Sequence, residues 1–391
     1  SGGYTMNPRD VVIVSACRTP IGKNMGQFKD VRARQLAITA GAEAIKRADI
    51  DPKLIDGIVM GECFTAMEGS LAARQVSMRL GFDERSNACV VNQNCASGMR
   101  ALDIQANNIL LGKEDIGMVI GVESMTNAPY VLEKARMGYR MGDSKIFDNM
   151  LHDGLIDELS GGHMGLTAEN VAEKYGITRE ECDQIAVRSH NLACKAIDEG
   201  IFKDEIVPVV IKSKKGEKVI TDDEHPIRGC TMETLAKLKP AFKKDGVITA
   251  ANASGINDAA AAVILMSWEK CQELGKKPMA KLVTCVAEGV APEVMGLGPA
   301  VAMPKALKAA GLKWEDMDYF EVNEAFSAQV LGVERMLKED YGYVVDWDKT
   351  NKFGSGIALG HPVGCTALRI IVTLVYEMIR SDYKYGMASL C

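Results

Sequence analysis

Short apolar runs and helical repeats alternate along the first third of the chain. Residues 11–16 are almost all apolar and end at Arg18-Thr19-Pro20-Ile21-Gly22, which is typical of a turn. This pattern predicts a buried strand. Apolar residues at helical spacing follow over 36–45, and the apolar run 55–60 predicts a second buried strand. The order strand, helix, strand predicts a layered α/β fold.

The two ends of the chain share a pattern of spacings. Arg100 follows Cys17 by 83 positions, and Arg369 follows Cys285 by 84. In both cases an apolar run begins with Gly-Met 17 positions after the arginine. These spacings predict two copies of one α/β unit packed together. The segment between them, roughly 122–250, is richer in Met, Asp, Lys and Gly, and is either an insertion that covers a site or a plain surface excursion.

Composition narrows the class of protein. A chain of 391 residues is long enough for two or three domains, and its net charge of −6 argues against general nucleic-acid binding. No apolar stretch is long enough to predict a membrane span. Eleven cysteines without a zinc-type pair indicate a reducing compartment, so we expect a cytoplasmic protein with no metal site.

Cys95 lies between the apolar run 88–91 and helical spacing from Met99 onward. We therefore expect it at a strand-to-helix turn, where backbone N–H groups and the helix dipole lower the pKa of a thiol. Small neighbours on its C-terminal side leave room for a substrate. The alternative is a buried packing cysteine, which the residue taken alone favours.

Two further motifs contain residues suited to acyl-transfer chemistry. Asn323, in Asn-Glu-Ala-Phe, follows an apolar-acidic run and could orient a water or donate to an oxyanion; the alternative is a helix N-cap. His361 lies in the glycine-rich segment 354–365 and could take a proton from a thiol. A capping histidine in a tight turn is the alternative. The glycines do not follow the dinucleotide-binding pattern.

These three motifs together resemble the thiolase family, and the resemblance extends over essentially the whole chain. The other segments that carry it are Val12-Ile13-Val14-Ser15-Ala16-Cys17-Arg18-Thr19-Pro20-Ile21-Gly22, Gly121-Val122-Glu123-Ser124-Met125-Thr126, His163-Met164-Gly165-Leu166-Thr167-Ala168-Glu169-Asn170 and Asn252-Ala253-Ser254-Gly255-Ile256-Asn257-Asp258.

The resemblance implies duplicated βαβαβαββ halves in a layered α/β/α/β/α core. Residues 1–121 with 251–273 would form the N-terminal half, and 274–391 the C-terminal half. Residues 122–250 would form an inserted loop domain for coenzyme A binding and oligomer contacts. The family continues past the position of Cys391 through a glycine-rich turn and a last strand, so we expect the sequence to be incomplete at this end.

The resemblance also assigns catalytic roles. Cys95 matches the acyl-carrying nucleophile, His361 the histidine that activates it, and Asn323 the asparagine that positions an oxyanion-binding water. Cys391 matches a second catalytic cysteine. A glycine amide beyond Cys391 normally completes an oxyanion hole with the Cys95 N–H, and one such donor is typically worth about 3–4 kcal/mol.

For substrate binding, the resemblance implies contacts with the pantetheine arm and the acyl group of a coenzyme A thioester. An apolar pocket with few polar groups suits such a ligand. Arg228 stands in an altered basic run and would reach a phosphate of coenzyme A. The other expected contacts are Ser254, Gly255, Ile256, His163, Met164, Phe242, Met295 and Phe326.

The implied activity is that of a transferase in fatty acid metabolism that condenses two acetyl-CoA to acetoacetyl-CoA and CoA, and reverses this by thiolysis. One alternative is a 3-oxoacyl-CoA thiolase for longer or aromatic acyl chains, because Gly162 stands where short-chain enzymes commonly have Tyr. A silent acyl-CoA-binding protein is the non-enzyme alternative. We expect no cofactor, no nucleic acid or membrane partner, and a homodimer or homotetramer.

Overall fold

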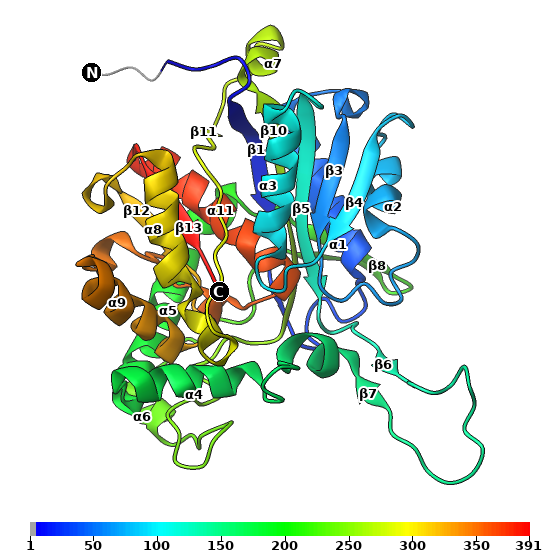
Figure 1. Cartoon of the computed structure of the whole chain (residues 1–391). Coiled ribbons are helices and arrows are strands. Elements are labelled where there is room, and N and C mark those ends of the chain that lie inside the picture. Colours follow the sequence, from blue (N-terminus) through cyan, green and yellow to red (C-terminus); the bar gives the residue numbers. More distant parts are fainter. Residues whose placement is uncertain (1–4) are drawn as a thin grey trace.

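Seven strands within residues 5–391, the part of the chain that this computed structural model describes, form one mixed sheet (Figure 1). In spatial order they are β11 (Ala280–Lys281), β1 (Val11–Arg18), β10 (Asn257–Ser267), β5 (Ile116–Ser124), β3 (Gly57–Gly61) and β4 (Asn87–Val91), with β2 (Gly22–Lys23) paired to β10. Strand β3 runs parallel to β4 and β5, whereas β10 runs antiparallel to β1 and β5. The longest strand, β10, lies near the centre of the sheet.

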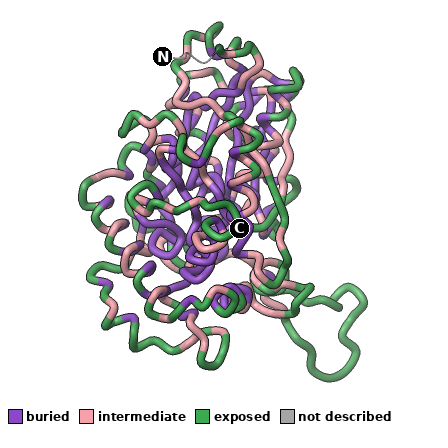
Figure 2. The backbone as a smooth tube through the Cα atoms, turned by 60° about the vertical axis from the view of Figure 1, so that its left-hand side comes forward, coloured by how far each residue is buried: buried purple, intermediate pink, exposed green. Residues whose placement is uncertain are grey.

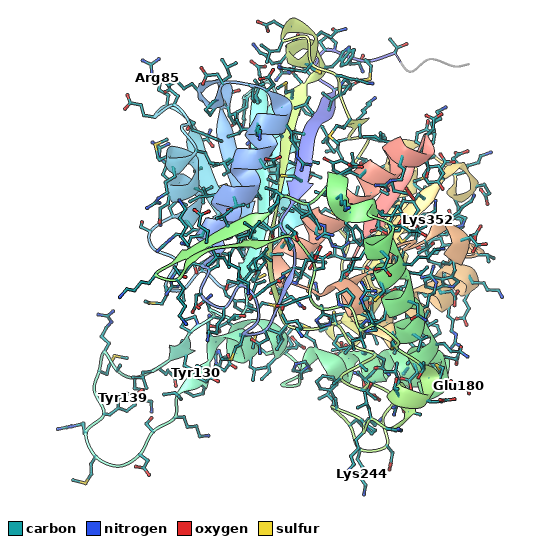
Figure 3. The ribbon with its side chains drawn as sticks, turned by 180° about the vertical axis from the view of Figure 1, so that it is seen from behind. Arg85, Tyr130, Tyr139, Glu180, Lys244 and Lys352 are labelled. Atoms are coloured by element: carbon teal, nitrogen blue, oxygen red, sulfur yellow. The ribbon has the colours of Figure 1, made fainter. Side chains whose placement is uncertain are left out.

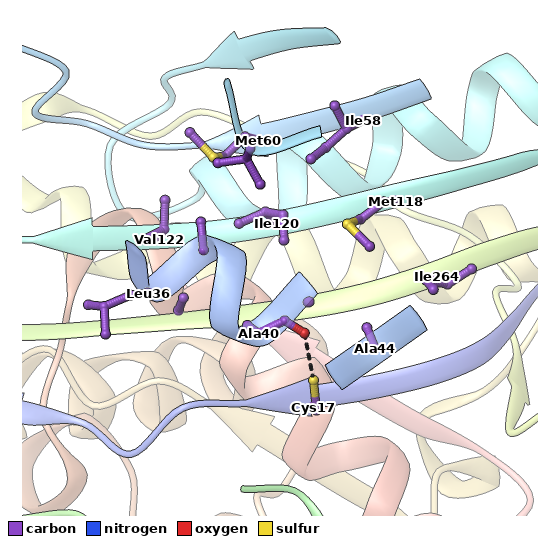
Figure 4. Packing of buried hydrophobic residues seen from close by; sticks show 14 of the residues in the cluster. Cys17, Leu36, Ala40, Ala44, Ile58, Met60, Met118, Ile120, Val122 and Ile264 are labelled. Carbon is purple, nitrogen blue, oxygen red and sulfur yellow. Dashed lines mark hydrogen bonds between the residues drawn. The ribbon is translucent and has the colours of Figure 1, made fainter. Parts of the chain in front are cut away.

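Successive side chains of the central strands point to opposite faces, as the period of a strand requires. In β5, Met118 and Ile120 pack with α1 (Ala33–Ala48) on one face, while Val119 belongs to the core on the other (Figure 4). All eleven residues of β10 are buried. A strand covered on both faces reads as a continuous apolar run, which explains why these strands showed little alternation in the sequence.

Helix α11 (Val363–Ser381) connects the large sheet to a second, smaller one. It packs against β5 and β10 on one side and against β12 (Tyr319–Val322) and β13 (Gly386–Ser389) on the other. The strands β12 and β13 pair in parallel. Because α11 lies between two sheets, 14 of its 19 residues are buried. This central layer also contains α3 (Ser97–Leu110), which contacts α11 and β5.

The remaining elements surround these layers. The helices are α2 (Ala72–Arg79), α4 (Met164–Tyr175), α5 (Arg179–Asp198), α6 (Met232–Ala236), α7 (Trp268–Glu273), α8 (Gly298–Ala310), α9 (Ser327–Tyr341) and α10 (Gly356–Leu359), with short turns at η1 (Pro52–Leu54), η2 (Leu151–Leu155), η3 (Ile201–Asp204), η4 (Pro292–Leu297), η5 (Trp314–Asp316) and η6 (Trp347–Lys349). Two small hairpins are β6 (Tyr130–Val131) with β7 (Phe147–Asp148), and β8 (Val209–Ser213) with β9 (Gly216–Ile220).

The strands predicted from apolar runs are present. The second copy of the repeat differs from the first around Cys285, because Cys17 lies in β1 whereas residues 282–291 have no regular secondary structure. A strand needs a hydrogen-bonded neighbour. Residues of this segment and of β13 line one apolar cavity of about 440 Å³. The second sheet is correspondingly small, with two strands in the described residues.

The segment between β6 and β7 projects away from the rest of the molecule (Figure 1). Residues 130–146 are exposed along their whole length (Figure 2). Elsewhere in 122–250, α4 and α5 pack onto α9 and belong to the body of the protein. The domain boundaries expected from the sequence remain a prediction.

None of the described helices combines the length and the hydrophobicity needed to cross a lipid bilayer. Within the same residues, no group of three or more His, Cys, Asp or Glu side chains is placed to hold a metal ion.

Candidate active site

Cys95 lies in a tight turn between the end of β4 and the start of α3, as the sequence predicts. Asn94 adopts a left-handed conformation with φ of 50°, which Asn tolerates better than most residues. Its carbonyl oxygen accepts a hydrogen bond of 2.6 Å from the Ser97 hydroxyl, and its N–H donates to the Asn92 side chain at 2.9 Å. These local bonds fix the direction of the Cys95 side chain.

His361 brings its imidazole to Cys95 from the other end of the chain. The Nε2–Sγ distance is 3.2 Å, although the two residues are 266 positions apart. The other ring nitrogen, Nδ1, lies 2.6 Å from the Thr366 hydroxyl, which donates its own proton to the Pro362 carbonyl at 3.0 Å. The hydroxyl therefore accepts from Nδ1–H, which leaves Nε2 free to accept the proton of the Cys95 thiol.

The backbone around His361 is held by Asn257. The Asn257 side-chain oxygen accepts from the His361 N–H at 2.9 Å. Gly360 has a φ of 106°, and a Cβ added there would lie 2.5 Å from the Asn257 side chain. Only glycine allows this approach, so the glycine of the Gly-His-Pro motif has a structural reason.

Burial makes both members of the pair neutral. It raises the pKa of the Cys95 thiol far above its ordinary value, with the nearby Cys391 adding to the shift. It lowers the pKa of His361 to about 4, helped by the charge of Arg369. The backbone N–H at Cys95 does lower the pKa of its thiol, as the sequence predicts, but loss of solvation is larger and the net shift is upward.

Asn323 lies directly after β12 and is fully buried. Its N–H donates to the Ser389 carbonyl at 3.0 Å, and its side-chain oxygen accepts from Ser355 at 3.4 Å. The side-chain Nδ2 has no partner, and an unsatisfied buried donor costs about 1–3 kcal/mol. Asn323 does not cap a helix, since α9 begins at Ser327 after Phe326. A free amide donor of this kind suits a water or a developing oxyanion.

A cavity of about 500 Å³ opens onto Cys95 and His361. Its walls are mainly apolar. His163 stacks on Phe242 with 4.5 Å between ring centroids, and Phe326 meets Phe242 edge-on at 6.3 Å. The structure brings eight of the nine expected substrate contacts to this cavity. They are Ser254, Gly255, Ile256, His163, Met164, Phe242, Met295 and Phe326.

Three expected site residues do not line this cavity. Arg228 pairs with Asp198 at 2.7 Å on the surface, where both side chains are about 60% exposed. Cys391 lines the second cavity, of about 440 Å³, which it shares with Cys95, and burial raises its pKa to about 12. Asn323 is enclosed by its neighbours. Gly162, the position expected to widen the pocket, is not among the lining residues either.

Several residues at the site escaped the sequence reasoning. Asn257 and Glu123 stand inside segments that carry the family resemblance, but nothing in those segments indicates their contacts. Thr366 stands two positions after Gly364, just past the glycine-rich segment 354–365, where nothing indicates its contact with His361. Phe64 follows the predicted strand at 55–60, and an apolar residue at the carboxyl end of a buried strand was the available signal.

Comparisons with known proteins agree on one family. A family model described as "Thiolase, N-terminal domain" matches residues 11–269, and one described as "Thiolase, C-terminal domain" matches 276–391. An acetyl-CoA acetyltransferase of Syntrophomonas wolfei is 51% identical over 98% of this chain and 96% of its own length. One from Cupriavidus necator is 45% identical over the same shares of the two chains.

Solved structures resemble this fold closely. The acetyl-CoA acetyltransferase from Syntrophomonas wolfei superposes with a TM-score of 0.97 at 62% identity, covering 98% of this chain and 96% of that one. Human mitochondrial 3-ketoacyl-CoA thiolase gives a TM-score of 0.93 at 38% identity, with coverage of 98% and 97%.

Proposed function

The chain belongs to the thiolase family, and from this premise we propose that it is an acetyl-CoA C-acetyltransferase with Cys95 as its nucleophile. The fold class predicted from the sequence is confirmed by the match to solved thiolase structures. The relatives are named acetyl-CoA acetyltransferases, so the alternative of a longer-chain thiolase is not favoured.

The observation that carries this proposal is the 3.2 Å contact between Cys95 Sγ and His361 Nε2 at the cavity. His361 takes the thiol proton as the sulfur attacks the thioester carbonyl of acetyl-CoA. The C–S bond to coenzyme A breaks, the proton passes to the departing thiolate, and the acetyl group stays on Cys95. A neutral thiol beside a neutral base suits this transfer, since no charge is buried before the substrate arrives.

Carbon–carbon bond formation follows with a second acetyl-CoA. One α-proton of its acetyl group must leave, and the resulting carbanion attacks the acetyl carbonyl on Cys95, which releases acetoacetyl-CoA and returns the thiol. We assign the proton abstraction to the thiolate form of Cys391, which shares the second cavity with Cys95. The proton that Cys391 takes passes to the Cys95 sulfur as the C–S bond to the acetyl group breaks, so both groups return to their starting forms. Asn323 is assigned to the oxyanion, directly or through water, because its amide donor is otherwise unpaired.

The cavity supports coenzyme A as the carrier. Its mainly apolar walls suit a pantetheine arm. Lys23 is the lysine among the lining residues, and its side chain is exposed to solvent. Its positive charge can bind a phosphate of coenzyme A. Arg228 forms an ion pair with Asp198 outside the cavity, so it would have to leave Asp198 before it could bind a phosphate of coenzyme A. We propose that no cofactor is needed beyond coenzyme A thioesters.

The experiment is incubation of the protein with acetyl-CoA, followed by intact-mass measurement and by assay of acetoacetyl-CoA thiolysis. We expect one acetyl group per chain, mapped to the peptide that contains Cys95, and CoA-dependent loss of acetoacetyl-CoA. A protein that binds acetyl-CoA without acquiring the acetyl group would be a silent acyl-CoA-binding protein instead.

The pKa of His361 sets an expected pH dependence. The base is active when neutral, so acetylation of Cys95 is lost as pH falls through a pKa of about 4 and is constant above about pH 6. Rapid-quench mass spectrometry across the pH range measures this rate, with circular dichroism to confirm folding at each pH. A rate that instead climbs steadily through pH 8–9, as for an isolated thiol with a pKa of about 8.5, would contradict the role of His361.

The projecting segment between β6 and β7 supports a homotetramer. It exposes Met137 and Met141 by 79% and 98%, with Leu132, Tyr139 and Ile146 also exposed. Figure 3 shows Tyr130 and Tyr139 on this projection, away from the body of the chain. Apolar side chains gathered on a projecting segment are typical of a contact surface, and we propose a second copy of this chain as its partner.

Light scattering tests this assembly. We expect the intact protein to have four times the 42.3 kDa mass of one chain. Replacement of residues 132–146 by a short Gly-Ser turn is expected to leave dimers with thiolysis activity. A variant that stays tetrameric would show that the contact lies elsewhere.

Two further proposals concern the setting of the enzyme. The eleven free cysteines support a cytoplasmic location, because thiols stay reduced in that compartment. The proposed activity supports a role in fatty acid metabolism.

A further inference from the structure

Phe64 is a buried aromatic side chain at the catalytic end of the cavity, with no role in the chemistry described above. It is 4% exposed and lines the same cavity as Cys95. It also forms one apolar cluster with Met125 and Val363, against which Cys95 packs. Phe64 is the aromatic member of this cluster, so its ring presents a rigid apolar surface on the side where Cys95 packs.

The ring of Phe64 lies directly against the backbone of η2. A Cβ added to Gly154 would lie 2.4 Å and 2.6 Å from two atoms of the ring, which is closer than carbon atoms approach. Gly154 therefore gives the ring its place, and Leu155 beside it also lines the cavity. With η2 behind it, the ring cannot retreat in that direction when an acyl group presses on it.

The backbone of Phe64 is fixed to the same group that fixes the His361 turn. The Glu123 carboxylate accepts from the N–H groups of Cys63 at 2.8 Å and Phe64 at 3.0 Å. It also accepts from Gly364 at 3.0 Å, in the first turn of α11 and three positions after His361. The buried Glu123 carboxylate thus holds the backbone of Phe64 and the turn that carries His361 at a constant separation.

We propose that Phe64 is the specificity-determining residue that restricts the acyl group on Cys95 to a short chain. The inference rests on the proposed function and deepens it, since it names the feature that selects the substrate. A fixed ring rejects longer acyl groups through steric overlap, while the pantetheine arm is held by other residues toward Phe242. Substitution of Phe64 should therefore change the relative rates for different chain lengths.

The test is a thiolysis panel with 3-oxobutanoyl-, 3-oxohexanoyl- and 3-oxooctanoyl-CoA. In Phe64→Ala, the ratio of kcat/KM for the eight-carbon substrate to that for the four-carbon substrate should rise about 10-fold or more, because one or two methylene groups in a closed pocket discriminate by about that factor. Phe64→Leu should give a smaller rise and guards against loss of folding in the alanine variant. Gly154→Ala should lower the ratio, since its methyl group displaces the ring toward the cavity.

Phe242→Ala is the matched control, with the same loss of a ring from the same cavity. It should lower kcat/KM for all three substrates and leave their ratio within about threefold. The inference would be overturned if the ratio of kcat/KM for the eight-carbon to the four-carbon substrate were equal in Phe64→Ala and Phe242→Ala. It would also be overturned if the wild type cleaved the eight-carbon and four-carbon substrates equally fast. In both outcomes the wild type still acetylates Cys95, whereas failure of the proposed function appears as a wild type with no acetyl-enzyme at all.

Discussion

Cys95→Ser is expected to abolish thiolysis and condensation together, with kcat reduced by about 10⁴-fold or more. A serine hydroxyl is a far weaker acid than a thiol. His361, whose pKa is about 4, is too weak a base to remove its proton while the attack proceeds. The acetyl-enzyme should also disappear, because no soft nucleophile remains beside the imidazole. Steady-state thiolysis of acetoacetyl-CoA and intact-mass measurement after addition of acetyl-CoA check the two effects separately.

The thiol of Cys63 also lies near the nucleophile, so the site of acetylation must be mapped as a control. Cys63 lines the same cavity, and its thiol donates to the Asn94 carbonyl at 3.2 Å. Digestion of the acetylated wild type should place the acetyl group on the peptide with Cys95 and none on the one with Cys63. Cys194→Ser, on α5 outside the cavity, should behave as wild type. Acetyl on Cys63, or persistent acetylation in Cys95→Ser, would show that the nucleophile has been misassigned.

The sequence could place Cys95 at a strand-to-helix turn because that prediction depends on local patterns. It could not pair Cys95 with His361 by physical reasoning alone, since 266 positions separate them. The family resemblance supplied that pairing. The pKa of Cys95 shows most clearly what local sequence patterns cannot predict. A helix terminus is a local feature and was predicted, whereas burial comes from remote segments and reverses the sign of the shift.

The repeat within the chain illustrates a second limit. Matched spacings correctly indicated a related layout around Arg100 and Arg369, but not the conformation of residues 282–291. Whether a segment forms a strand depends on a neighbour to pair with, and that neighbour comes from elsewhere in the chain. Arg228 shows the same dependence on context, because its ion pair with Asp198 follows from the position of α5 and not from its own segment.

The contacts of Thr366 could not be predicted from the sequence, because nothing in its segment indicates that its side chain meets His361. In the structure its hydroxyl accepts from His361 Nδ1–H and donates to Pro362, which determines the tautomer of the catalytic imidazole. That arrangement exists because α11 begins immediately after Pro362 and turns residue 366 back toward the ring.

His361→Asn is expected to lower the rate of Cys95 acetylation by about 10²- to 10⁴-fold, the usual contribution of a general base. The pKa of the thiol is raised by burial, so without an acceptor at 3.2 Å it stays protonated at neutral pH. Binding of acetyl-CoA should change little, because the cavity walls remain. Rapid-quench mass spectrometry gives the acetylation rate, and its dependence on acetyl-CoA concentration separates binding from chemistry.

Thr366 provides graded variants of the same effect, which distinguish a loss of base strength from a general loss of structure. Thr366→Val keeps the side-chain shape but removes the acceptor for Nδ1–H, so the ring loses one buried hydrogen bond and its tautomer preference. A bond of that kind is worth about 1–3 kcal/mol, so acetylation should slow by about 10- to 100-fold with binding unchanged. Thr366→Ser keeps the hydroxyl and should retain a rate within about threefold of wild type. If the valine and serine variants lose activity equally, the hydroxyl does not position the imidazole and the effect is one of packing. If only the valine variant is slow, the proton of the Cys95 thiol passes to a histidine whose acceptor nitrogen is selected by Thr366.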